Sequence, residues 1–123
     1  MGTIRYVLLT DRPLKSGIAP IDLIYQISGK RKYYRTDKKL FSESWDPKKQ
    51  QAIYLDKKTA KKLLPTVDYD LMLTAKDIIE FNQDLNSLKM DIRKIEKGFE
   101  INGIPYSSEM VVEKLKEIHN SKT

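Results

Sequence analysis

The chain has 123 residues, of which 40% are hydrophobic and 33% charged, and it carries a net charge of +6. This size and composition fit one folded domain spanning 1–123 and do not fit a disordered chain. Because there is no cysteine, only one histidine (His119) and no apolar run near 20 residues, disulfides, thiol chemistry, paired-histidine metal sites and membrane-spanning helices are excluded.

Three strands are predicted in the first third of the chain. Residues 3–9 are rich in β-branched and aromatic side chains, and residues 21–28, which follow Pro20, alternate apolar with polar side chains. The Ser28–Gly29–Lys30 stretch predicts a turn, with a return strand over 31–36. We therefore expect a three-stranded antiparallel sheet over about 3–36.

Residues 37–67 show no sustained periodicity and are expected to form an irregular connector. Within it, Trp45–Asp46–Pro47 predicts an anchor followed by a turn, because Asp before Pro favours turn initiation. Lys48 and Lys49 are as consistent with phosphate contacts as with a role in solubility. One or two helical turns are expected over 57–64, ended by Pro65.

A long helix is predicted over about 68–97, starting near Asp68 or Asp70 and ending at Gly98. Its apolar stripe repeats every seven residues, at Leu71, Ile78, Leu85, Ile92 and Phe99. A second, short helix begins at Ser107–Ser108–Glu109 and is expected to fold back on the first, so that the helical part covers about 68–120. The predicted fold class is α+β, with a three-stranded antiparallel sheet packed on a long helix.

Positive charge is concentrated in the first half of the chain. Residues 1–64 carry 15 Lys and Arg against 6 Asp and Glu, whereas residues 65–123 carry 8 against 11. The segment 29–39 alone holds six basic residues around two tyrosines. Basic side chains neutralise phosphates, and arginine also binds the O6 and N7 atoms of guanine, so the pattern favours nucleic-acid binding.

The alternation within the strands assigns their faces. If the turn has two residues, Ile21, Leu23, Tyr25 and Ile27 share one face with Tyr34 and Thr36, and this face should pack on the long helix. The opposite face then carries Arg5, Asp22, Ile24, Gln26, Ser28, Arg31, Tyr33 and Arg35. We expect this face to read bases, and Lys30, Lys32, Lys38 and Lys39 to meet phosphates. A turn of three residues would instead place each side chain of the third strand on the opposite face of the sheet.

Two other interpretations remain open. Lysines commonly keep an edge hairpin soluble, but solubility does not account for outward Gln26, Arg31, Tyr33 and Arg35 together. The long amphipathic helix could instead be the active surface of a protein–protein interaction module. The acidic residues of that helix are interpreted as a solvated face, His119 as a surface residue, and no group of residues is suited to catalysis.

Three short strings give the sequence a family resemblance. Gly17–Ile18–Ala19–Pro20–Ile21, Gly29–Lys30–Arg31 and Trp45–Asp46–Pro47–Lys48–Lys49–Gln50 resemble the N-terminal arm-site DNA-binding domain of tyrosine-type integrases, of the phage integrase family, from Bacteroides-type mobile elements. The resemblance covers roughly residues 3–118. Two features depart from the family: Ile24 stands where a basic residue is usual, and the stretch 52–73 is longer than the usual connector.

The resemblance implies a role in site-specific recombination and DNA integration. The sheet would enter the major groove of double-stranded arm-type DNA, and the long helix would offer a surface to other integrase subunits. The chain would be a fragment of a larger recombinase or a stand-alone relative. It would act in the bacterial cytoplasm, with no cofactor, no small-molecule substrate and no membrane contact.

Overall fold

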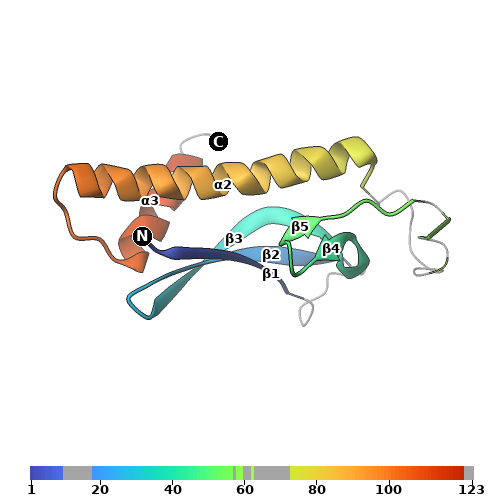
Figure 1. The fold of residues 1–123 in the computed structure, drawn as a ribbon, viewed down its shortest axis with the longest axis horizontal. Coiled ribbons are helices and arrows are strands. Elements are labelled where there is room, and N and C mark those ends of the chain that lie inside the picture. The colour runs from blue at the N-terminus through green and yellow to red at the C-terminus, as the bar shows by residue number, and fades with distance from the viewer. Residues whose placement is uncertain (10–17, 57, 60–61, 63–72, 121–123) are drawn as a thin grey trace.

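The structure of the protein, a computed structural model, describes residues 1–9, 18–56, 58–59, 62 and 73–120. Strands β1 (Thr3–Leu8), β2 (Ile18–Ile27) and β3 (Lys30–Phe41) form an antiparallel sheet in the order β1–β2–β3. Helix α2 (Ala75–Ile101) extends along one face of this sheet, and the shorter α3 (Ser108–Asn120) lies beside it (Figure 1). The α+β fold predicted from the sequence is confirmed.

The turn between β2 and β3 has two residues. Ile27 pairs with Lys30, and the intervening Ser28 and Gly29 both have positive φ, at 52° and 77°. Two-residue turns with two positive φ angles match the right-handed twist of a hairpin, which explains glycine at the second position. The strand register, with Leu23 opposite Tyr34, confirms the predicted division of residues between the two faces.

Strand β1 matches the prediction to within one residue, but β2 starts earlier and β3 ends later than the sequence predicts. Strand β2 begins at Ile18, and β3 continues to Phe41 through an irregularity in the pairing between Pro20 and Asp22. At this point the Thr36 hydroxyl donates a hydrogen bond to the Ile21 carbonyl (2.7 Å) and accepts one from the Lys38 N–H (3.1 Å). The prediction of an irregular connector from residue 37 is therefore wrong for 37–41.

A second small sheet follows β3. After a 3-10 turn at Ser42–Ser44, strands β4 (Trp45–Asp46) and β5 (Gln51–Ala52) pair with each other. Asn82 of α2 holds β5 through both backbone groups of Ala52, with distances of 2.7 and 3.0 Å. The predicted Trp45 anchor is confirmed, because its side chain is buried in the core. Of the helical turns expected at 57–64, Lys58, Thr59 and Lys62 are helical, and the rest lies outside the described residues.

Helix α2 begins and ends later than predicted. Residues 68–72, where the start was expected, lie outside the described residues, and the helix begins at Ala75. Thr74 is its N-cap and forms a capping box with Asp77, which satisfies the free N–H groups of the first turn. Gly98 lies inside the helix, which instead ends at Asn102 and at Gly103, where φ is +66°.

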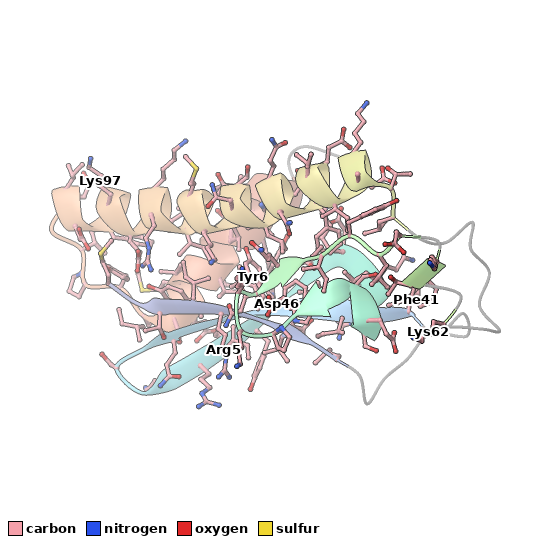
Figure 2. The ribbon with its side chains drawn as sticks, turned by 45° about the vertical axis from the view of Figure 1, so that its right-hand side comes forward. Arg5, Tyr6, Phe41, Asp46, Lys62 and Lys97 are labelled. Atoms are coloured by element: carbon pink, nitrogen blue, oxygen red, sulfur yellow. The ribbon has the colours of Figure 1, made fainter. Side chains whose placement is uncertain are left out.

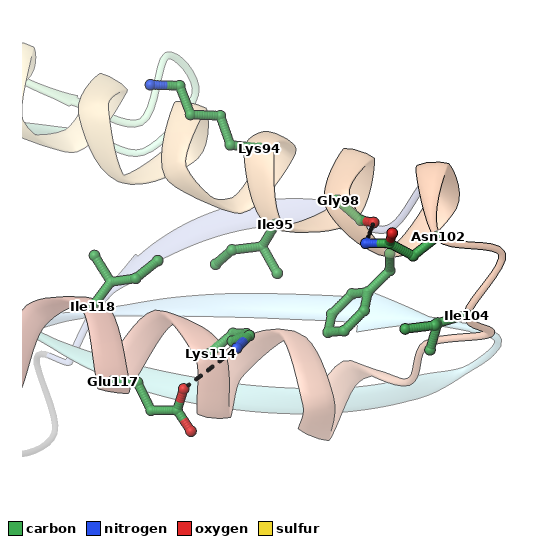
Figure 3. A pocket seen from close by; sticks show the side chains of 9 residues that line it. Lys94, Ile95, Gly98, Asn102, Ile104, Lys114, Glu117 and Ile118 are labelled. Carbon is green, nitrogen blue, oxygen red and sulfur yellow. Dashed lines mark hydrogen bonds and ion pairs between the residues drawn. The ribbon is translucent and has the colours of Figure 1, made fainter.

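The core lies between the sheet and the two helices. Figure 3 shows the chain leaving α2 near Asn102 and returning as α3, as expected for a helical pair. The buried side chains are contributed by all three layers. From the sheet come Tyr6, Ile21, Leu23, Tyr25 and Leu40, from α2 Ile78, Phe81, Leu85, Leu88 and Ile92, and from α3 Val111, Val112 and Leu115.

Candidate nucleic-acid interface

The face of the sheet turned away from α2 carries most of the residues that the sequence predicts to contact DNA. Figure 2 shows Arg5 on this side, which we call the outer face. The strand register places its side chains in three rows across β1, β2 and β3. These rows are Thr3–Gln26–Arg31, Arg5–Ile24–Tyr33 and Val7–Asp22–Arg35.

The outer face combines an apolar centre with an exposed polar rim. Ile24 is only 7% exposed, whereas its neighbour Tyr33 is 55% exposed. Arg5, Arg31 and Arg35 are exposed around this pair, and Gln26 is half-buried. The surface therefore offers hydrogen-bonding and cationic groups around an apolar floor.

Two of the arginines are held by neighbours on β2. The Arg31 Nε donates a hydrogen bond to the Gln26 Oε1 at 3.0 Å, and the Arg35 Nε lies 2.5 Å from the Asp22 Oδ1. Both contacts use Nε, so they do not consume the terminal NH2 groups with which arginine binds guanine. The guanidinium groups are thus oriented but keep donors for a ligand.

The predicted phosphate-binding lysines separate into three groups. Lys30 and Lys32 are exposed near the hairpin tip, although they share a face with Ile27 and Tyr25. Lys39 is exposed and pairs with Pro20 beyond the irregularity.

Lys38 lies on the helix side of the sheet. Its Nζ is 2.5 Å from the Asp84 Oδ2 and 5.7 Å from the centre of the Phe81 ring. The structure therefore does not bring Lys38 to the outer face. Ser28 is exposed and lies in the two-residue turn between β2 and β3.

Several charged side chains of the helices have partners that the sequence analysis missed. His119, interpreted as a surface residue, is half-buried, with its Nε2 3.5 Å from the Asp91 Oδ2 and its ring 5.9 Å from that of Tyr34. Asp77 caps α2, and Asp84 pairs with Lys38. The interpretation of the acidic residues as one solvated face is wrong for Asp91, which is half-buried and holds α3 to α2. Asp84 is 56% exposed although it pairs with Lys38 of the sheet.

A buried polar network ties the N-terminus to α2. The Glu96 side chain, 1% exposed, accepts hydrogen bonds from the Gly2 N–H at 2.7 Å, the Tyr25 hydroxyl at 2.6 Å and the Arg93 guanidinium at 2.7 Å. Burial alone would raise the pKa of Glu96, but these hydrogen bonds outweigh it and hold the pKa below its ordinary value. The available sequence signal was a glutamate four residues after Ile92, on the apolar stripe.

Within the described part of the chain, no three His, Cys, Asp or Glu side chains are grouped so that they could hold a metal ion. No helix of that part is long and apolar enough to cross a membrane.

The sequence matches a family model described as the Arm DNA-binding domain over residues 6–112. Domains of this family are DNA-binding modules of integrase-type proteins. The chain belongs to the Arm DNA-binding domain family. No curated protein and no solved structure matches it.

Proposed function

We propose that the protein binds double-stranded DNA by laying the outer face of its sheet in the major groove. It would do so as the N-terminal arm-site module of a site-specific integrase, with 1–123 acting as one domain and catalysing no reaction itself. The observation that carries this proposal is the gathering of Arg5, Arg31 and Arg35 with Gln26 and Tyr33 on the face of the sheet opposite the two helices. The Gly29–Arg31 and Trp45–Gln50 strings further suggest a Bacteroides-type mobile element.

The dimensions of the sheet suit this placement. Neighbouring strands lie about 4.8 Å apart, so β1 and β3 are separated by about 10 Å. The major groove of B-DNA is about 12 Å wide and exposes a distinct donor and acceptor pattern for each base pair. The rows of side chains would point at base edges, while both edges of the sheet would approach the phosphate backbones.

The residues of the outer face divide by chemistry. Arg31 and Arg35, oriented by Gln26 and Asp22, suit the O6 and N7 acceptors of guanine. The exposed ring of Tyr33, which pairs with the buried Ile24 across the strands, suits contact with the methyl group of thymine. Ser28, Lys30, Lys32 and Lys39 surround this area and would meet phosphates, whereas Lys38 would remain with Asp84.

A second candidate function is the docking of another integrase subunit on α2. This helix exposes Ile79, Met90 and Ile101, which are 59%, 53% and 74% accessible. Successive members of this set are eleven residues apart, about 16 Å along the helix, so they do not form the contiguous apolar patch that marks a strong interaction surface. The concentration of arginines on the sheet instead favours DNA binding as the primary role.

Selection of bound sequences from a random duplex library tests the proposal. We expect a preferred site to emerge, and we expect its affinity to fall steeply with salt because phosphate contacts release counterions. Sedimentation of the protein with and without that duplex then distinguishes DNA binding from self-association. Failure to bind any duplex at moderate salt would overturn the proposal and favour the interaction module.

A further inference from the structure

The geometry points to a second DNA contact outside the sheet, in the turn between β4 and β5. This β4–β5 turn comprises Pro47, Lys48, Lys49 and Gln50. We propose that Lys48 and Lys49 bind the phosphate backbone along the β1 edge of the sheet. The inference rests on the proposed function and adds a separate element to its interface.

The turn is held rigidly by its own side chains and by the core. The Asp46 Oδ1 accepts hydrogen bonds from the backbone N–H groups of Lys48 and Lys49, at 3.0 and 3.2 Å. The preceding Trp45 is buried, and Asn82 of α2 holds Ala52 on the other side. Because the backbone of Lys48 and Lys49 is already fixed, the turn loses less conformational entropy when a ligand binds.

Gln50 fastens the same turn to β1. Its side-chain Oε1 accepts a hydrogen bond from the Tyr6 N–H at 2.9 Å. Its φ of 53° lies in the left-handed region, which is unfavourable for a residue other than glycine. Gln50 therefore combines an unfavourable backbone conformation with a hydrogen bond to Tyr6, and this bond fixes the turn beside Arg5.

The position of the turn makes it a border of the outer face. Gln50 lines the same shallow hollow as Arg5, Gln26 and Arg31. Gln50 and Pro47 also line a neighbouring hollow with Arg5 and Val7. A duplex seated on the outer face would therefore have one backbone running beside the β4–β5 turn.

The distribution of charge indicates why this border matters. Strand β3 carries six Lys and Arg residues, of which Lys38 is paired with Asp84 on the helix side and five remain, whereas Arg5 is the only cation of β1. The DNA strand on the β3 side would thus meet many cations, and the strand on the β1 side would meet almost none from the sheet. Lys48 and Lys49 are exposed, and no ion-pair partner for them lies in the described part of the chain.

The test is a double variant, Lys48→Gln with Lys49→Gln, titrated against the preferred duplex and a scrambled one at several salt concentrations. We expect both affinities to fall about equally, by about tenfold or more at 0.1 M salt, and the salt slope to decrease by about two. In ethylation interference, modification of certain phosphates along one wall of the groove should weaken binding by the wild type. Modification of the same phosphates should not weaken binding by the variant.

Two further variants serve as controls. Lys94→Gln with Lys97→Gln removes the same charge from exposed positions of α2, which Figures 2 and 3 show on the side away from the sheet. Lys48→Arg with Lys49→Arg keeps the charge and should retain the wild-type slope. All variants should unfold at the wild-type temperature, because these side chains are exposed.

The outcomes separate this inference from the function on which it rests. If the wild type binds no duplex, the proposed function fails. If the wild type binds and Arg31→Ala weakens it, but the Lys48/Lys49 pair has no more effect than the Lys94/Lys97 pair, the contact at the β4–β5 turn is refuted. The same holds if the interference pattern of the variant is unchanged.

Discussion

Glu96 links the N-terminal residues to helix α2 through one buried side chain. Its carboxylate accepts a hydrogen bond from the Gly2 N–H. Arg93 donates hydrogen bonds both to the Gly2 carbonyl, at 2.8 Å, and to Glu96. A side chain at Gly2 would collide with the Tyr25 ring, so glycine permits this close approach. Strand β1 is therefore fastened to α2 just before Arg5 enters the outer face.

The lowered pKa of Glu96 makes its contribution to stability depend on pH. The Glu96 carboxylate binds a proton more tightly in the unfolded chain than in the folded chain. The ionised carboxylate therefore stabilises the fold above pH 4.5, the ordinary pKa of the group. Hydrogen bonds to charged groups contribute about 1.5–3 kcal/mol each, partly offset here by burial. We expect Glu96→Gln to lower the free energy of unfolding at pH 7 by about 1–3 kcal/mol.

Urea unfolding at pH 7 and at pH 3 measures this effect. The difference in free energy of unfolding between wild type and variant should be smaller at the lower pH. The wild type loses the stabilisation by the ionised Glu96 as the pH falls through the pKa that this group has in the folded chain. Glu80→Gln, at an exposed position of the same helix, should behave as the wild type at both values. A gap of equal size at both pH values would contradict the assigned role of the carboxylate.

At the scale of elements, the start of α2 depends on the capping box. The Thr74 Oγ1 accepts from the Asp77 N–H at 3.1 Å, and the Asp77 Oδ2 accepts from the Thr74 N–H at 3.0 Å. Thr74→Ala removes the first bond and should lower the free energy of unfolding by about 1 kcal/mol. Thr74→Ser keeps an accepting hydroxyl and should restore most of it. Equal denaturation midpoints for the Ala and Ser variants would show that the box does not stabilise the helix.

The centres of the elements could be predicted from the sequence, but several ends could not. Alternation through Ile21, Leu23 and Tyr25 sufficed for β2, and the seven-residue stripe sufficed for α2. The start of α2 could not be placed, because two acidic residues, Asp68 and Asp70, also resembled caps. Gly98 resembled a helix end, yet Asn102–Gly103 ends the helix, since one glycine costs only about 1 kcal/mol inside it.

The candidate site was predictable where local geometry determines it. A two-residue turn and strict alternation were enough to place Arg31, Tyr33 and Arg35 on one face. The position of Lys38 depends on Asp84, which is 46 residues further along the chain. The tie between Gln50 and Tyr6 likewise joins segments 44 residues apart. Such contacts arise from tertiary packing and leave no periodic signal.

At the scale of the whole molecule, both helices pack on the same face of the sheet (Figure 1). In the part of the chain that the structure describes, neither helix covers the outer face or the β4–β5 turn. Two acidic residues of α2, Asp84 and Asp91, contact Lys38 and His119. Of the residues in the three rows of the outer face, Arg5, Arg31 and Arg35 are basic and only Asp22 is acidic, so this face carries a net positive charge, as a surface facing a polyanion requires.

Substitution of 7-deazaguanine in the preferred duplex tests whether the outer face reads bases in the major groove. This base lacks the N7 acceptor of the major groove but leaves the minor groove and the phosphates unchanged. We predict that the wild type loses about 1–3 kcal/mol of binding free energy at a guanine contacted by arginine. We also predict that Arg31→Ala no longer distinguishes the two bases at one such position. Equal affinity of the wild type for both duplexes at every guanine would contradict the account.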